Sequence, residues 1–187
     1  MYFNNINRRV ERFISPMLEL LHKKCGLTPN SVSIIGFGIG TISVGFVLFK
    51  KIELALLLLL LTIIFDGLDG TLARKLNLQT KLGEKLELFF DRINEIMWFL
   101  ALVFIGLASF KIAILAIVAI LLITSVREKS KFDPGFKRTI LFIGYLIHNF
   151  EIALALIFIA NLAGFVASLV VIDYKHQKVA DNNGIKI

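Results

Sequence analysis

Four carboxylates occur within one short stretch of the chain, at spacings that suit metal-assisted chemistry. Asp66 and Asp69 are three residues apart at the end of a long apolar run, and Glu87 and Asp91 are four residues apart further on. On a helix, each spacing places both side chains on one face. Carboxylates beside an apolar run are costly unless they are paired or bind a metal. Hard oxygen ligands in this number suit Mg²⁺, Mn²⁺ or Ca²⁺, and two such ions can hold both oxygens of a displacement at phosphorus.

Small residues beside these carboxylates leave room for a ligand. Gly67, Gly70 and Ala73 keep one side of the first acidic helix bare. Arg74 adds a planar guanidinium that suits a phosphate, and Gly83 clears the start of the second helix. A simpler interpretation is that carboxylates at a membrane edge only pair with neighbouring Lys and Arg. The complete set at these spacings argues against that interpretation.

The composition predicts that the helices carrying these residues belong to a membrane protein. The chain has 187 residues, 57% hydrophobic and 19% charged, with a mean hydropathy of +0.79. A soluble domain is about 45–50% apolar and about 25% charged, whereas uncharged runs such as 54–65 and 112–123 recur here. Helices satisfy their own backbone in lipid, and the period-2 alternation of a membrane barrel is missing. We therefore expect an all-α, polytopic membrane protein.

Six segments are candidates to cross the hydrocarbon core, which needs about 20 apolar residues. They are residues 31–49, 54–72, 86–107, 110–126, 136–150 and 152–172, the fifth being short. Ahead of them, Ser15-Pro16 begins an amphipathic helix that we expect to lie on the membrane surface. The predicted organisation is an interfacial segment at 1–27, a six-helix catalytic domain at 28–174 and a tail at 175–187.

The distribution of Lys and Arg predicts that both termini and the acidic stretch face the cytoplasm from the cell membrane. Of the 21 Lys and Arg residues, only Lys50, Lys51 and Lys111 fall on the loops after the first and third spans. Cytoplasmic loops carry the excess of these residues. The net charge of +7 then reflects anionic headgroups, phosphorylated substrates and topology, so we expect no nucleic-acid partner.

Two further features of the sequence concern helix packing and disulfide formation. Gly36 and Gly40, four residues apart in the first span, predict a close approach of helices rather than a nucleotide-binding loop. Cys25 is the single cysteine, which excludes an intrachain disulfide.

The acidic stretch resembles the signature of the CDP-alcohol phosphotransferases. Residues 66–74 read Asp-Gly-Leu-Asp-Gly-Thr-Leu-Ala-Arg, and Gly83, Glu87 and Asp91 follow. The family pattern is D-x2-D-G-x2-A-R-x8-G-x3-D-x3-D, and every fixed position matches except Glu87. Members of the family are six-span membrane enzymes with an amphipathic N-terminal helix. A Thr-Pro-Asn sequence like 28–30 often opens their first span.

The resemblance implies a reaction. A CDP-linked donor, CDP-diacylglycerol or CDP-archaeol, loses CMP while an acceptor hydroxyl attacks the phosphorus distal to cytidine. The metal ligands implied are Asp66, Asp69, Glu87 and Asp91, holding two Mg²⁺ or Mn²⁺ ions, with Asp91 as the catalytic base. The CDP-binding residues implied are Asp66, Gly70, Ala73, Arg74 and Gly83. The resemblance also implies a homodimer.

Glu87 departs from the family, which has Asp at that position. Glutamate keeps the charge and can still bind a metal. Its carboxylate sits differently by about 1 Å, and a misplacement of that size can cost about 100-fold in rate. We expect an active enzyme with an altered metal geometry.

Basic residues near the fourth and fifth spans predict a phosphorylated acceptor. Arg127, Lys129, Lys137 and Arg138 can bind a phosphate, or they can simply contact anionic lipid. The cluster is similar to the basic pocket of phosphatidylinositol-phosphate synthases and their archaeol-based relatives, which implies inositol 1-phosphate as the acceptor. A glycerol-phosphate acceptor and a CDP-inositol donor remain alternatives. So does a cation-binding transporter without chemistry, although a transporter has no need of bare helix faces beside Arg74.

Overall fold

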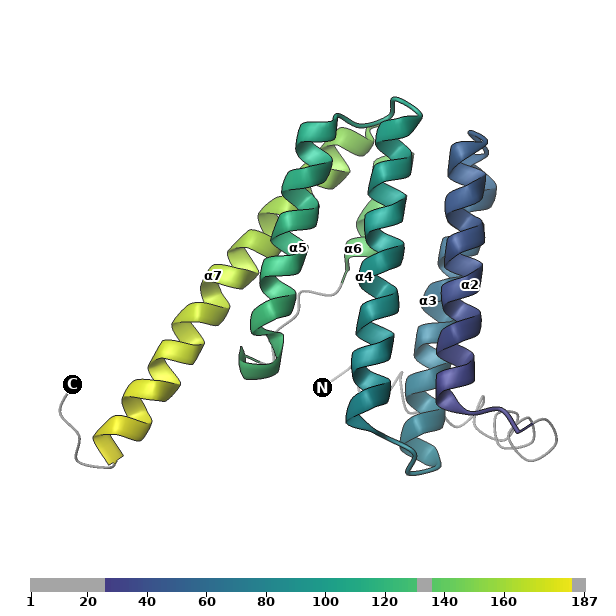
Figure 1. Ribbon diagram of the computed structural model, residues 1–187. Helices are drawn as coiled ribbons and strands as arrows, with labels where there is room; N and C mark the ends of the chain where they lie inside the picture. The colour runs from purple at the N-terminus through teal and green to yellow at the C-terminus, as the bar shows by residue number, and fades with distance from the viewer. Residues whose placement is uncertain (1–25, 131–135, 183–187) are drawn as a thin grey trace. The chain divides into compact units, whose positions relative to one another are not determined.

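The computed structural model describes residues 26–130 and 136–182, with side chains as far as Tyr174, and the regular secondary structure of these residues consists of helices (Figure 1). The helices are α2 (Pro29–Leu48), α3 (Ile52–Lys75), α4 (Lys81–Phe104), α5 (Phe110–Ser130), α6 (Lys137–Leu146) and α7 (Phe150–Asn182). The prediction of an all-α chain is therefore confirmed for the described part. The predicted interfacial helix within 1–27 lies outside it.

Within the described residues, three helices are long and apolar enough to cross a membrane: α2, α5, and α7 from Phe150 to Tyr174. Helix α6 has 10 residues and is therefore about 15 Å long, half the thickness of a typical hydrocarbon core. The membrane assignment is supported by these helices, and the count of six spans stays a prediction. Helix α7 continues to Asn182, so the predicted tail at 175–187 begins as helix, and the domain boundary at 174 stays a prediction.

The chain forms two compact units, divided within α4 between Asn94 and Glu95. In the first unit, α2 packs along α3 (Figure 1). Val32 from α2 and Leu72 from α3 form a buried contact, surrounded by the partly buried side chains of Leu27, Phe65, Leu68 and Leu76. In the second unit, α7 packs against both α5 and α6.

Helix α2 begins within the Thr-Pro-Asn sequence at residues 28–30. Thr28 is the N-cap, and its Oγ1 accepts a hydrogen bond from the backbone N–H of Ser31 at 3.2 Å. The Ser31 hydroxyl in turn accepts a hydrogen bond from the Thr28 N–H at 3.1 Å. Pro29 occupies the first helical position, where its missing N–H costs nothing. This reciprocal cap fixes where α2 begins.

Helices α2, α3, α4 and α6 end in tight turns of the same backbone type. Each turn contains one residue with positive φ: Lys50, Asn77, Gly106 and His148. The residue after it donates a backbone hydrogen bond to a carbonyl five positions back, as Leu78 does to Ala73 at 2.9 Å. This arrangement satisfies carbonyls that a helix end leaves unpaired. Because the turns are short, consecutive helices reverse direction, and α3 and α4 are joined by residues 76–80 alone.

The start of α5 is capped from another helix of the second unit. The Glu151 carboxylate on α7 accepts hydrogen bonds from the Ser109 backbone N–H at 2.8 Å and from the Ser109 hydroxyl at 2.6 Å. A negative charge at a helix N-terminus is favourable, because free N–H groups gather there. The bond therefore ties the beginning of α7 to the beginning of α5.

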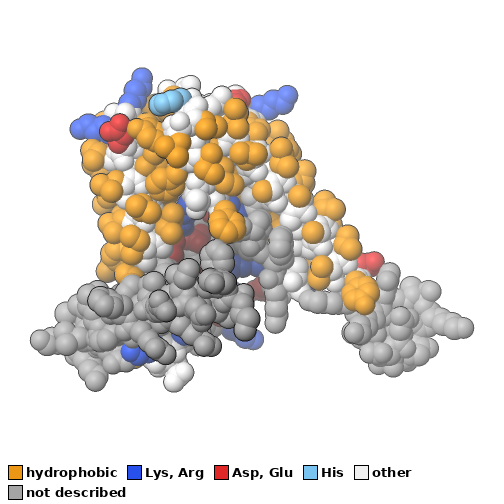
Figure 2. Space-filling view, turned by 180° about the vertical axis from the view of Figure 1, so that it is seen from behind, with side chains coloured by type: hydrophobic (Ala, Val, Ile, Leu, Met, Phe, Trp, Pro, Cys, Tyr) orange, Lys and Arg blue, Asp and Glu red, His pale blue; other side chains and the backbone are white. Residues whose placement is uncertain are grey.

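The outward-facing side chains of the helices are largely apolar. Leu57 on α3 and Val170 on α7 are 61% and 65% exposed. Figure 2 shows hydrophobic side chains over the visible flanks of the helices, with Lys, Arg and His at helix ends. Large exposed apolar surfaces are rare on soluble monomers, so lipid is the expected neighbour of these faces.

Candidate active site

The four predicted carboxylates lie on consecutive helices of the first unit, at matching heights. Asp69 is six residues before the end of α3 at Lys75, and Glu87 is six residues after the start of α4 at Lys81. Each is therefore about 9 Å along its helix from the connecting loop. Asp66 and Asp91 lie about one turn further away from the loop. Because a short loop joins the two antiparallel helices, the Asp66–Asp69 pair on α3 and the Glu87–Asp91 pair on α4 lie at similar distances from that loop.

Asp69 is the most deeply buried of the four carboxylates. Its side chain is 2% exposed. The Ser33 hydroxyl on α2 donates a hydrogen bond of 2.5 Å to Asp69 Oδ2. Asp69 Oδ1 is buried and accepts no hydrogen bond from the described part of the chain. A buried acceptor without a partner is unfavourable, so this oxygen is suited to a bound cation.

Asp66, Glu87 and Asp91 are each partly buried. Asp91 lies close enough to Asp69 for its charge to act on that carboxyl group. Among the described residues, no three His, Cys, Asp or Glu side chains gather closely enough to hold one metal ion. The chemistry of the set fits Mg²⁺ or Mn²⁺, since it consists of carboxylate oxygens with one orphaned atom at Asp69. The four-ligand assignment stays a prediction.

The bare side of α3 is present where the glycines predicted it. A Cβ placed on Gly67 would meet no atom of the described chain within 4 Å. A Cβ on Gly70 would lie 3.4 Å from Arg74 Nη1, and Arg74 Nη2 donates to Thr71 Oγ1 at 3.4 Å. The guanidinium group therefore lies back along its own helix, and both Gly70 and Ala73 remain partly exposed. Their binding of CDP stays a prediction.

Gly83 permits a close contact with α2 that the sequence did not indicate. A Cβ on Gly83 would lie 3.1 Å from Asn30 Oδ1 and 3.1 Å from Thr80 Oγ1. The Gly83 N–H also donates to Thr80 Oγ1 at 3.0 Å, which caps the start of α4. Gly83 therefore lets the start of α4 approach the start of α2. Its predicted role in clearing space for CDP is untested.

Helix α2 contacts both acidic helices through one stripe of residues. A Cβ on Gly36 would lie 3.3 Å from Phe65 Cβ on α3, and one on Gly40 would lie 2.7 Å from Asn94 Cγ on α4. The close helix approach predicted from these glycines is confirmed. Between them, the Phe37 ring stacks on Phe90 of α4, with ring centroids 4.6 Å apart.

Two polar residues that lie between the helices of this hairpin and α2 were missed from the sequence. Ser33 lies three residues before Gly36, on the same face of α2, and holds Asp69. Asn94 follows Asp91 by three residues on α4; it is 4% exposed and its Oδ1 accepts no hydrogen bond from the described chain. The helical spacing of Ser33 from Gly36 and of Asn94 from Asp91 indicates a shared helix face. Spacing alone does not indicate which neighbouring helix a side chain meets.

The predicted acceptor residues belong to the second unit. Arg127 and Lys129 are exposed on the last turn of α5. Lys137 and Arg138 lie on the first turn of α6 and are only 3% and 9% exposed. Charged groups are rarely buried to this degree unless they are paired. The connecting residues 131–135 lie outside the described part, and binding of an acceptor stays a prediction.

The fold and the acidic motif together define a helical membrane protein with a carboxylate site on one helical hairpin. Residues 26–172 match the family model described as CDP-alcohol phosphatidyltransferase. The chain belongs to this family, as the resemblance of its acidic stretch implied. The match contains the whole acidic stretch from Asp66 to Asp91, including the Glu87 departure, and excludes only the ends of the chain.

Two relatives share part of the sequence. A protein of Aquifex aeolicus (strain VF5) is 34% identical over 100 residues, which are 52% of this chain and 51% of that protein. A bifunctional IPC transferase and DIPP synthase of Thermococcus kodakarensis is 33% identical over 109 residues, which are 51% of this chain and 24% of that protein. This chain therefore matches about half of the first relative and about a quarter of the second.

The fold is also that of a solved enzyme. The phosphatidylinositol phosphate synthase PgsA1 of Mycobacterium tuberculosis, with CDP-DAG bound, is similar with a TM-score of 0.72 and 19% identity, over 86% of this chain and 94% of that chain. A second structure of PgsA1, in complex with manganese and citrate, gives a TM-score of 0.70 and 18% identity, over 84% and 87%. At this identity the likeness establishes the fold.

Proposed function

We propose that the protein transfers a phospho-substituted alcohol from a CDP-linked lipid to an acceptor hydroxyl, with release of CMP, in phospholipid headgroup synthesis. The observation that carries the proposal is the acidic motif, with Glu87 at the position of its third Asp, on one hairpin of a chain that belongs to this family. The donor is CDP-diacylglycerol or CDP-archaeol. CDP-DAG bound to PgsA1, which has the same fold, supports a donor of this kind.

The reaction breaks one bond and forms another at phosphorus. The acceptor oxygen bonds to the phosphorus distal to cytidine, and the bond from that phosphorus to the bridging oxygen of CMP breaks. The acceptor proton passes to a carboxylate oxygen of Asp91, which serves as the general base. Gly70, Ala73 and Arg74 line the CDP site together with Asp66 and Gly83. The exposed face at Gly67 supports this placement.

The acidic residues would hold the metal. Asp66, Asp69, Glu87 and Asp91 supply carboxylate oxygens suited to two Mg²⁺ or Mn²⁺ ions. When bound, such ions offset the charge that develops on the departing CMP phosphate. The unpartnered Asp69 Oδ1 supports this assignment from the present chain, and the manganese complex of PgsA1 supports it from a protein of the same fold.

We propose inositol 1-phosphate as the acceptor. The two buried cations Lys137 and Arg138, with Arg127 and Lys129 on α5, supply charge for a phosphorylated alcohol. The structural likeness to a phosphatidylinositol phosphate synthase agrees with this choice. A second candidate has CDP-inositol as the donor, and the sequence likeness to a bifunctional IPC transferase and DIPP synthase favours it.

The proposed setting is the cell membrane, with six spans and a homodimer. Both termini and the carboxylate hairpin face the cytoplasm, because the loops on that side carry nearly all of the Lys and Arg. The catalytic domain extends over residues 28–174. A cytoplasmic site gives access to water-soluble acceptors and lets CMP leave into water.

The test is CMP release by purified protein in lipid vesicles. Each reaction contains Mg²⁺ or Mn²⁺, CDP-diacylglycerol or CDP-archaeol, and one acceptor: inositol 1-phosphate, inositol, glycerol 3-phosphate, glycerol 1-phosphate or serine. We expect release with inositol 1-phosphate and none after chelation of the metal. Asp69→Asn provides the inactive control.

Each other outcome has a definite meaning. Release with glycerol 3-phosphate or glycerol 1-phosphate would replace the acceptor and keep the reaction. Release only with CDP-inositol and inositol 1-phosphate would establish the second candidate. A protein that neither binds CMP nor releases it would contradict the proposed reaction and favour a cation-binding membrane protein.

A further inference from the structure

Ser33 makes a polar contact that the proposed reaction does not yet use. Its Oγ lies 2.5 Å from Asp69 Oδ2 and 3.2 Å from the backbone oxygen of Pro29. A hydroxyl has one proton to donate, and the shorter contact leads to the charged acceptor, where hydrogen bonds are stronger. The hydroxyl therefore joins α2 to the Asp69 carboxylate, 36 positions away along the chain.

The other carboxylate oxygen of Asp69, Oδ1, is buried and has no hydrogen-bond donor in the described chain. Asp69 itself is 2% exposed. Two independent observations thus meet at one carboxylate: a donor holds Oδ2, and nothing in the described chain satisfies Oδ1. Burying an unsatisfied acceptor is unfavourable, and a cation at Oδ1 would remove that cost.

We infer that Ser33 is a positioning residue, which orients the Asp69 carboxylate so that Oδ1 faces the metal site. This inference rests on the proposed function. Groups that hydrogen-bond to metal ligands orient the ligands, and the loss of such a group typically costs about 10–100-fold in metal affinity or activity. Ser33 comes from a helix that carries none of the four motif carboxylates, so α2 takes part in building the site.

The packing around Ser33 keeps the hydroxyl within reach of Asp69. One turn further along α2, the lack of a side chain at Gly36 lets the helix approach Phe65 and Asp66. On the other side of Ser33, Val32 packs against Leu72. The α2–α3 spacing is therefore set by apolar contacts that do not depend on the hydrogen bond. Removal of the hydroxyl alone should leave the two helices in place and release the carboxylate.

The test measures binding of Mn²⁺ to the purified full chain in detergent, with no donor lipid or acceptor present. The free Mn²⁺ concentration is followed by electron paramagnetic resonance, and the dissociation constant is compared between variants. Ser33→Ala should weaken Mn²⁺ binding by about 10-fold or more, the usual effect of losing a group that orients a metal ligand. Ser33→Thr keeps the hydroxyl and should restore binding close to that of the parent chain.

The matched control is Thr41→Ala. Thr41 is an exposed residue of the same helix, and its hydroxyl donates only to the backbone oxygen of Phe37 at 3.0 Å among the contacts described. Thr41→Ala should leave the affinity unchanged. If Ser33→Ala does not fold, as judged by circular dichroism, Ser33→Cys takes its place. A thiol is a weak donor, so Ser33→Cys should also weaken Mn²⁺ binding.

Failure of this inference differs from failure of the proposed function. If the parent chain binds Mn²⁺ and releases CMP while Ser33→Ala binds Mn²⁺ equally well, the role of Ser33 is wrong and the reaction stands. Equal weakening by Ser33→Ala and Thr41→Ala would also overturn the role of Ser33, because the effect would then belong to α2 as a whole. If the parent chain neither binds Mn²⁺ nor releases CMP, both proposals fail.

Discussion

Single residues of the carboxylate hairpin have separable roles, and Asp91 is the plainest case. It follows Glu87 by one turn of α4, and its charge reaches Asp69 on α3. A group that takes a proton from the acceptor is needed for the chemical step more than for holding the donor. Replacement of Asp91 should therefore affect turnover and binding differently.

We predict that Asp91→Asn lowers the rate of CMP release by at least about 100-fold, because the amide cannot take the acceptor proton. Binding of the CDP-lipid should be largely retained, which stabilisation by CMP in a thermal unfolding assay would measure. Glu84→Gln is the matched control, since Glu84 is an exposed acidic residue on the first turn of the same helix. Normal turnover of Asp91→Asn would remove Asp91 from the role of base.

Glu87 tests how far the site tolerates a departure from the family motif. Glu87→Asp introduces the family residue but draws the carboxylate back by about one methylene, in a site that is built around glutamate. We predict a fall in kcat/KM of up to about 100-fold, the cost of a displacement near 1 Å, with metal binding retained. Titrating CMP release with Mg²⁺ and Mn²⁺ measures both quantities. A variant faster than the parent would show that the site is built for aspartate.

At the scale of elements, α2 is the helix that holds the hairpin together. It contacts α3 through Ser33 and Gly36, and α4 through Phe37 and Gly40. Ser43 adds a hydrogen bond from its hydroxyl to the Ala55 backbone oxygen at 2.7 Å near the other end of the α2–α3 pair. Within a membrane, the hydrophobic effect does not drive helices together. They associate instead through this kind of close approach and polar contact.

Gly40 should be the position on α2 least tolerant of a side chain. We predict that Gly40→Ala lowers the free energy of unfolding by about 1–3 kcal/mol, because the new Cβ overlaps the Asn94 side chain. Gly38→Ala is the control: a Cβ there meets nothing described within 4 Å, and alanine favours a helix over glycine by about 0.5–1 kcal/mol. Circular dichroism during thermal unfolding in detergent compares the two variants.

A second substitution shows whether the overlap is the cause. Replacement of Asn94 by alanine makes room for the Cβ, so Asn94→Ala should restore much of the stability lost in Gly40→Ala. Equal destabilisation by Gly38→Ala and Gly40→Ala would contradict the close approach of α2 and α4 at Gly40.

At the scale of the whole molecule, the open question is how the helices cross the membrane. Three helices of the described chain qualify as spans by length and composition, whereas the apolar segments of the sequence predict six. The loop after α2 contains Lys50 and Lys51, and the loop between α4 and α5 contains no Lys or Arg. In contrast, the helix ends that flank the loop between α3 and α4 carry Arg74, Lys75, Lys81 and Lys85. The charge pattern therefore places these loops on alternate sides of the membrane.

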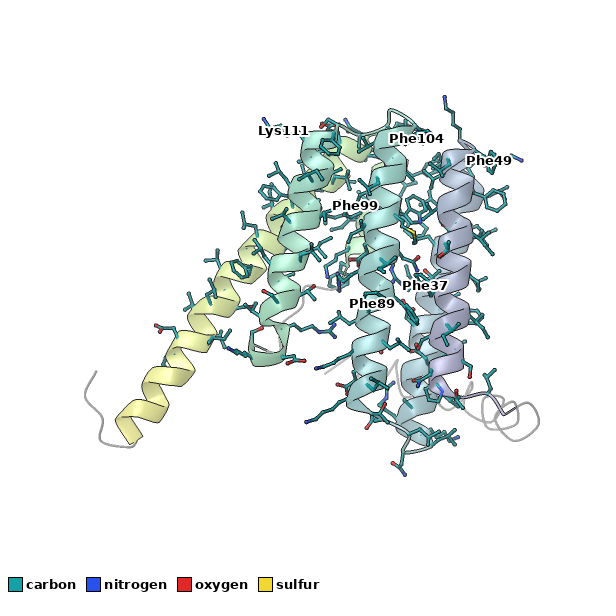
Figure 3. The ribbon with its side chains drawn as sticks, viewed as in Figure 1. Phe37, Phe49, Phe89, Phe99, Phe104 and Lys111 are labelled. Carbon is teal, nitrogen blue, oxygen red and sulfur yellow. The ribbon has the colours of Figure 1, made fainter. Side chains whose placement is uncertain are left out.

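We predict that Lys111→Cys is labelled from outside intact cells and that Lys75→Cys is not. Both residues are exposed, and Lys111 projects from the start of α5 (Figure 3). The experiment uses a Cys25→Ser background, which removes the single native thiol, and a maleimide that does not cross membranes. Lys75→Cys should react only after the cells are opened. Labelling of Lys75→Cys in intact cells would place the carboxylate hairpin on the outer side and contradict the proposed topology.

Much of the fold could be predicted because its signals are local. Apolar runs identify helices, and the first span predicted from residue 31 lies two residues inside the observed start of α2 at Pro29. Helix ends were harder, since turns can form on residues other than glycine: Lys50 and His148 adopt positive φ without being glycine. Helix α7 continues to Asn182, past the predicted span at 152–172, because a polar sequence can continue a helix once packing has started it.

The sequence by itself determined the acidic motif, the helical class and the family, because these depend on residue types and on spacings of three or four along one helix. Only the tertiary structure decided which helices meet at those residues: Ser33 at Asp69, Asn94 at Gly40 and Asn30 at Gly83. The physical reason is that spacing sets a face of a helix, whereas the rotation and approach of two helices depend on side-chain volumes across their whole contact.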